Sequence, residues 1–227
     1  MAKIRNAKGR REEETPSGYE RLFGNHKLGM LISKVQSTVI STGNELENIL
    51  AEKITNPEGV AIGKLNKNMR IFKKAKKNSG GKLHDIGADI LIKKDGKIKL
   101  IELKDGDTFD TKKVAGEVES LNLIKDMLVR QGTSKENITM HFCSFNAKNH
   151  EQIERGAKGL LPKGSAMTGR ELCNELGLDY DEIVNGRKSE QEDNFNYFLE
   201  ELIKIPEVRD KTTELMKKEP KEKSFMK

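Results

Sequence analysis

The chain has 227 residues, a net charge of +6, and equal shares (34%) of hydrophobic and charged residues. This length suits one sizeable core, so we expect residues 1–227 to form a single domain with frayed ends. No stretch approaches the roughly 18 apolar residues that span a bilayer, and the amino terminus lacks an apolar signal core; these features argue against a membrane partner and predict a cytoplasmic protein.

Residues 28–54 show apolar spacing typical of two helices that meet near Ser41-Thr42-Gly43. Glu47 lies at the margin of the apolar face of the second helix, closer to its centre than the neighbouring glutamates. We therefore expect Glu47 to reach past the edge of the core. The apolar face itself is formed by Leu46, Ile49, Leu50 and Ile54.

A basic connection follows, and between Lys64 and Lys82 it contains no acidic residue. Such a local field attracts a polyanion and makes its binding depend on salt. The alternative is a solvated surface loop that happens to be rich in lysine. The candidate DNA-binding lysines in this run are Lys73, Lys74, Lys76 and Lys77.

The next segment predicts a β-hairpin, with strands over residues 89–94 and 97–104 joined by the turn Asp95-Gly96. Strand alternation puts Glu102 and Lys104 on one face. If the turn has two residues, counting back along both strands places Asp89 directly opposite Glu102. Three charged groups would then converge at one end of the hairpin.

These three residues are the types that Mg²⁺-dependent phosphodiester cleavage requires, namely carboxylate oxygens for the ion and a group that orients water. The acid-x-lysine pattern alone is weak evidence, because it occurs three more times in the chain. Only the match at residues 102–104 ends an apolar strand and has an aspartate at the head of the preceding strand. The alternative is a surface salt-bridge ladder.

A helix is predicted next, because apolar residues recur at the spacing of one helix face: Val114, Val118, Leu121, Ile124 and Leu128. A strand is predicted to follow over residues 138–145. A strand, a helix and a strand in succession favour a crossover within a mixed sheet. The helical part continues over about residues 150–205, and the tail from about Pro206 is expected to be frayed.

The start of the helix after the hairpin is a candidate phosphate-binding segment, because helix amino termini attract anions. Ordinary capping, by Asp110 or Thr111, with solvated lysines explains the same residues equally well. The candidates there are Thr111, Lys112 and Lys113.

The segments His84–Ile92 and Leu100–Gly106 resemble the core of PD-(D/E)xK nucleases, in particular type II restriction endonucleases, and the resemblance extends over about residues 40–145. It implies an α/β fold with a central mixed sheet flanked by helices. It also implies that Asp89 and Glu102 hold Mg²⁺, with the Leu103 carbonyl as a further ligand.

By the same resemblance, Lys104 orients the attacking water and Glu47 is the additional glutamate that many members place on the preceding helix. No proline precedes Asp89, which departs from the pattern and leaves Asp85 as a rival for the first carboxylate.

The activity implied by the resemblance is Mg²⁺-dependent double-strand cutting of DNA at a short specific sequence, which leaves 5′-phosphate ends. A homodimer is expected, because two-fold protein symmetry matches a palindromic site. A cognate DNA methyltransferase is implied, although not as a stable partner. Two alternatives remain: a structure-selective repair or junction-resolving nuclease, and a DNA-binding protein without catalysis.

Overall fold

The computed structural model describes residues 2–8, 16–55, 58–62, 75–79, 82–106 and 111–218, with the backbone alone for 75–79, 82–86 and 111–112. The chain divides into two compact units. We call residues 42–184 the sheet unit, and residues 1–41 together with 185–227 the helical unit. Whether the chain is a single domain, as the sequence predicts, stays a prediction.

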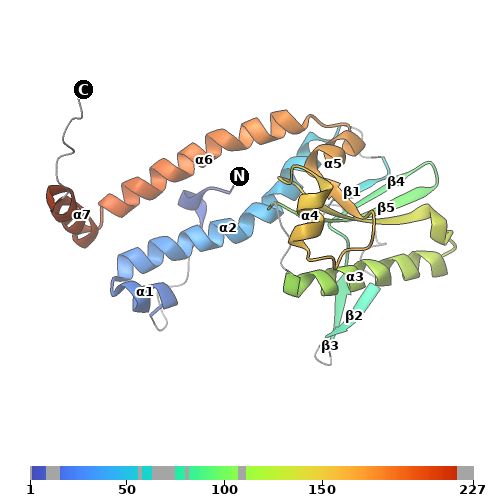
Figure 1. Ribbon diagram of the computed structural model, residues 1–227, viewed down its shortest axis with the longest axis horizontal. Helices are drawn as coiled ribbons and strands as arrows, with labels where there is room; N and C mark the ends of the chain where they lie inside the picture. The colour runs from blue at the N-terminus through green and yellow to red at the C-terminus, as the bar shows by residue number, and fades with distance from the viewer. Residues whose placement is uncertain are drawn as a thin grey trace, which may run out of the picture. The chain divides into compact units, whose positions relative to one another are not determined.

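The sheet unit is built on a mixed five-stranded sheet (Figure 1). In spatial order β1-β4-β5-β6-β7, the first two pairings are antiparallel and the last two are parallel. A separate two-stranded ribbon consists of β2 and β3. The strands are β1 (Val60–Ile62), β2 (Ala75–Ser79), β3 (Lys82–Ile86), β4 (Ile90–Lys94), β5 (Lys97–Lys104), β6 (Ile138–Ser144) and β7 (Ala166–Thr168).

Helices cover both faces of this sheet, as the α/β prediction requires. The predicted crossover is confirmed, since α3 connects the parallel strands β5 and β6. The helices of the chain are α1 (Gly18–Phe23), α2 (His26–Lys53), α3 (Thr111–Arg130), α4 (His150–Gly156), α5 (Gly169–Leu176), α6 (Tyr180–Ile203) and α7 (Pro206–Lys218), with short 3-10 turns at Ile4–Asn6 and Lys135–Asn137.

Alternation along the strands divides the core into two apolar clusters, one on each face. Ile98 and Leu100 of β5 belong to the cluster that contains the buried face of α3. Ile101 and Leu103 belong to the other cluster, together with residues of α2 and α5. A side chain that follows the alternation of Leu100 therefore lies on the α3 side of the sheet.

The predicted break near residues 41–43 is wrong, because α2 is one continuous helix from His26 to Lys53. Glycine in a helix interior costs only about 1 kcal/mol relative to alanine. The hydroxyl of Ser41 donates to the Ser37 carbonyl at 2.9 Å, so this polar group is satisfied within the helix. The boundary between the two units nevertheless falls between Ser41 and Thr42.

Two further expectations need correction. The predicted connection before the hairpin contains β1 and β2, and β1 pairs with β4 at the edge of the sheet. The tail is helical to Lys218 as α7: proline is favoured at a first helical position, and Glu214 pairs with Lys211 and Lys218 at helical spacing. No helix among the described residues is long and apolar enough to span a membrane.

Candidate active site

The register of the β4–β5 hairpin brings Asp89 alongside Glu102. Lys94 pairs with Lys97, and Ile90 pairs with Ile101, which confirms the predicted two-residue turn. Asp95 and Gly96 both have positive φ, as a type I′ turn requires. Asp89 precedes β4 by one residue, so extending the register by one position places Asp89 opposite Glu102.

Asp89 is fixed to β5 by a hydrogen bond. Its Oδ2 accepts from the backbone N–H of Leu103 at 2.7 Å. In a strand, the N–H and carbonyl of one residue point to the same side, so the Leu103 carbonyl points toward the side on which Asp89 lies. The carbonyl is therefore suitably directed to act with the Asp89 carboxylate on a shared ligand.

Glu102 and Lys104 lie on the α3 side of β5, as their alternation predicts. Lys104 Nζ donates to Glu102 Oε1 at 2.6 Å. The intervening Leu103 is buried in the opposite cluster. Two adjacent positions on the same strand face therefore present a carboxylate and an ammonium group together.

Sequence reasoning missed a further carboxylate, Glu117 on α3. Its Oε1 lies 2.9 Å from Lys104 Nζ, and its side chain is only 16% exposed. A signal was present, because Glu117 lies three residues after Val114 and four before Leu121, which are both fully buried. An acidic residue at such a position points toward the core.

Burial and like charge dominate the electrostatics of this cluster. Burial raises the pKa of Asp89 to about 6, with a contribution from the charge of Glu47, although the Leu103 N–H opposes the shift. Burial and the charge of Asp89 raise the pKa of Glu102 to about 7. Burial disfavours the charge of Lys104, but Glu102 and Glu117 outweigh it and raise the pKa of the ammonium group.

Glu47 lies on α2 between the fully buried Leu46 and Leu50 and is itself half-buried. Its charge contributes to the raised pKa of Asp89, which places it within electrostatic range of that carboxylate. The expected position of Glu47 at the edge of the apolar face fits this arrangement.

The predicted DNA-binding residues are described only in part. Lys73 and Lys74 lie outside the described residues, and Lys76 and Lys77 belong to β2, where only the backbone is described. Thr111 and Lys112 open α3, again with only the backbone described, and Lys113 is exposed.

Asp85, the rival first carboxylate, lies in β3, where it pairs with Lys76 of β2. Its side chain is not among those described. Asp89 accepts a hydrogen bond from the Leu103 N–H of β5, and the choice of Asp89 over Asp85 as the first carboxylate stays a prediction.

Within the described residues, no group of three or more histidine, cysteine, aspartate or glutamate side chains is arranged to enclose a metal ion. The site instead offers two carboxylates, of Asp89 and Glu102, and a nearby backbone carbonyl. Mg²⁺ commonly takes one or two carboxylates and completes its shell with water and substrate phosphate. Such an arrangement, with Lys104 beside it, is suited to phosphodiester hydrolysis.

Comparison with known proteins gives one informative relative. No family model and no solved structure matches the chain. The chain is 39% identical, over an alignment 227 positions long, to the type II restriction enzyme HhaII of Haemophilus parahaemolyticus, and the match covers 92% of this chain and 97% of that protein. Similarity of this extent over nearly the whole length shows that the chain belongs to the type II restriction enzymes, which are site-specific deoxyribonucleases.

Proposed function

We propose that this restriction enzyme is a PD-(D/E)xK nuclease that makes Mg²⁺-dependent double-strand cuts in DNA at a short specific sequence. The observation that carries the proposal is the grouping at the open end of the β4–β5 hairpin. Asp89 accepts from the Leu103 N–H of β5, and Lys104 contacts Glu102 on the same strand.

The charge balance of the site fits a divalent cation. Among the described residues, the charges that act on Asp89 and Glu102 include the carboxylates of Glu47 and Glu117 but a single ammonium group, that of Lys104. Oε2 of Glu117 is buried and has no hydrogen-bond partner among the described residues. Buried excess negative charge is costly, and a cation between Asp89 and Glu102 would offset it.

In this proposal Asp89, Glu102 and the Leu103 carbonyl hold Mg²⁺. When bound, the ion polarises the scissile phosphate and favours ionisation of a neighbouring water. Lys104 orients that water, and Glu47 supplies a further carboxylate near Asp89. The water oxygen forms a bond to phosphorus while the bond from phosphorus to the 3′-oxygen breaks. The attacking water gives up a proton, and the departing 3′-oxygen takes up a proton to become a 3′-hydroxyl. The phosphate remains on the 5′-oxygen, so the products are a 5′-phosphate and a 3′-hydroxyl.

The substrate is double-stranded DNA, and the proposed contacts to its backbone are the predicted lysines and the start of α3. Phosphate contacts position a protein on the duplex without reading its sequence. We assign this role to Lys73, Lys74, Lys76, Lys77, Thr111, Lys112 and Lys113. The enzyme would act in the cytoplasm beside a cognate methyltransferase that modifies the same sequence without forming a stable complex.

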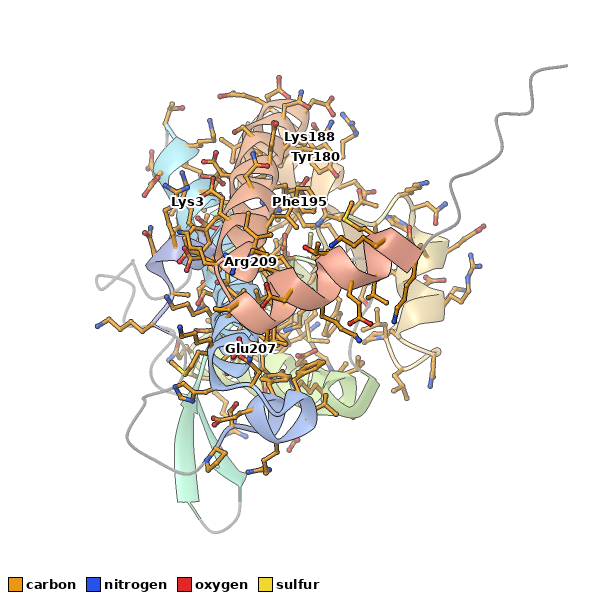
Figure 2. All side chains as sticks on the ribbon, turned by 90° about the vertical axis from the view of Figure 1, so that its left-hand side faces the viewer. Lys3, Tyr180, Lys188, Phe195, Glu207 and Arg209 are labelled. Carbon is orange, nitrogen blue, oxygen red and sulfur yellow. The ribbon has the colours of Figure 1, made fainter. Side chains whose placement is uncertain are left out.

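A homodimer is also part of the proposal, because each chain carries one such site and a double-strand cut requires two phosphodiester cleavages. The helical unit provides a surface for the second copy. On α6, Phe195 is 60%, Leu199 39% and Ile203 58% exposed, and their spacing of four residues places them on one stripe. Figure 2 labels Phe195 on this helix.

The test is incubation of the purified protein with unmodified plasmid DNA and Mg²⁺, with a chelator as control. We expect discrete fragments that require the metal, and sequencing of their ends should give one short recognition sequence with 5′-phosphates. Cleavage that persists in the chelator, or fragments with 3′-phosphates, would contradict the proposed chemistry.

A further inference from the structure

Glu117 is placed by its helix to act on the strand that carries the proposed site. It is the seventh residue of α3, and the helix packs its apolar face on the sheet through Val114 and Leu121. Both neighbours are fully buried, so the side chain between them is directed at the sheet rather than at solvent. Its position is set by the packing of α3 and not by the hairpin.

Lys104 is held between two carboxylates from different elements. Its Nζ lies 2.6 Å from Oε1 of Glu102 and 2.9 Å from Oε1 of Glu117. The two carboxylate side chains are 13% and 16% exposed, whereas Lys104 is 31% exposed. The lysine therefore has an open path to solvent, and two buried anions retain it.

The two anions are not equivalent once the proposed function is assumed. A cation on Glu102 would draw electron density from the oxygen that Lys104 contacts and would repel the ammonium group. Lysine has a long flexible stem and does not hold its position without a partner. Glu117, whose second oxygen is buried without a hydrogen-bond partner among the described residues, remains available as that partner.

We propose that Glu117 is a positioning residue that keeps the Lys104 ammonium group in the site while Glu102 is engaged by the metal. This inference rests on the proposed function. It assigns to α3 a part in catalysis that the acid-x-lysine pattern does not contain. Glu117 contacts neither DNA nor the ion in this scheme and acts only through Lys104.

The test compares Glu117→Ala and Glu117→Gln with Glu119→Gln, a control at an exposed position of the same helix. Single-turnover cleavage should fall about 100-fold in Glu117→Ala, the scale of a misplaced catalytic group. Glu117→Gln retains a hydrogen-bond acceptor, so its cleavage rate should be about tenfold higher than that of Glu117→Ala. The DNA affinity measured with Ca²⁺ and the Mg²⁺ concentration for half-maximal rate should each change less than about twofold. The thermal midpoint should change by only a few degrees.

A second readout does not depend on cleavage. Acetylation of Lys104 in the Mg²⁺-loaded protein, followed by mass spectrometry, should be at least about fivefold faster in Glu117→Ala than in Glu119→Gln, because the ammonium group is released to solvent. If Glu117→Ala fails to fold, the isosteric Glu117→Gln variant is compared with Glu119→Gln in both the cleavage and the acetylation experiments.

Three results would overturn the inference: a wild-type cleavage rate in both Glu117 variants, unchanged Lys104 acetylation, or a Mg²⁺ midpoint shifted tenfold or more, which would make Glu117 a metal ligand. Loss of DNA affinity and thermal stability in parallel with the rate would also overturn it in favour of a structural role. If the unmutated protein cuts no DNA, the proposed function fails, and the acetylation experiment still decides whether Glu117 retains Lys104.

Discussion

The sheet unit and the helical unit use apolar side chains in opposite ways. Both apolar clusters of the described chain lie in the sheet unit. Of the eleven large hydrophobic side chains that are exposed among the described residues, nine belong to the helical unit. An interface between permanently associated copies resembles a core cut in half. The difference therefore fits our proposals, in which the sheet unit holds the active site and the helical unit binds a second copy.

The largest expected effect is on the cleavage rate, which should depend on the proposed site in the sheet unit and not on an exposed residue of the helical unit. Glu102→Gln should lower cleavage at least about 1000-fold, because the variant lacks a carboxylate charge where the metal is proposed to bind. Glu192→Gln, an exposed substitution on α6, should leave the rate unchanged. Initial rates on plasmid DNA provide the measurement. Equal rates for the two variants would exclude the proposed site.

The next effect concerns packing. Leu100 is fully buried in the α3-side cluster, whereas Leu199 is 39% exposed on α6. Leu100→Ala should lower the free energy of unfolding by about 2–5 kcal/mol, as expected for truncation in a core. Leu199→Ala should cost less than about 1 kcal/mol at dilute, monomeric concentrations. Urea denaturation would measure both, and similar losses would contradict the contrast between the units.

Association is the effect expected of the helical unit. Replacement of Phe195 and Ile203 by serine together should raise the Kd of the dimer about 100-fold, because central apolar anchors carry most of the energy of an interface. Leu160→Ser, at a comparably exposed apolar position of the sheet unit, should leave the Kd unchanged. Sedimentation velocity over a concentration series is the measurement. A monomeric wild-type protein would contradict the dimer itself.

The smallest effect is a change in stability with pH at the proposed site. The folded-state pKa of Asp89 is raised above its usual value of 3.8 to about 6, so the folded state binds more protons than the unfolded state between these pH values. The ionised carboxylate therefore destabilises the fold above pH 6, and this cost disappears below about pH 4.

Asp89→Asn retains an acceptor for the Leu103 N–H and removes that charge. Without metal, the variant should be more stable than the wild type by up to about 3 kcal/mol at pH 8 and equal to it near pH 4. Chemical denaturation at several pH values in the presence of a chelator would measure the difference. A difference that does not vary with pH would show that the charge of Asp89 carries no such cost.

Local rules sufficed for the hairpin and for the residues it aligns. Asp95-Gly96 adopts the positive φ values of a two-residue turn, and the register follows from it. Period-two alternation then puts Glu102 and Lys104 on one face, and the spacing from Val114 to Leu128 identifies α3. Each of these inferences depends on residues within a few positions of one another.

Features that depend on contacts between distant elements were decided by the tertiary structure. The Glu117–Lys104 ion pair exists because α3 packs on the face of the sheet to which Lys104 points. A local sequence pattern does not predict which strand residue will contact a given helix residue. The continuity of α2 through Gly43 likewise overrides a local signal for a break, because propensity differences of about 1 kcal/mol are small beside the burial of Leu46 and Leu50.

The sequence by itself determined which groups the hairpin aligns, because turn type and strand periodicity are local properties. Only the tertiary structure decided how deeply those groups are buried, and which helices bring Glu47 and Glu117 within range of them. The physical reason is that desolvation and charge–charge energies depend on surroundings assembled from the whole sheet unit. The same carboxylates on an isolated hairpin would be ordinary solvated acids.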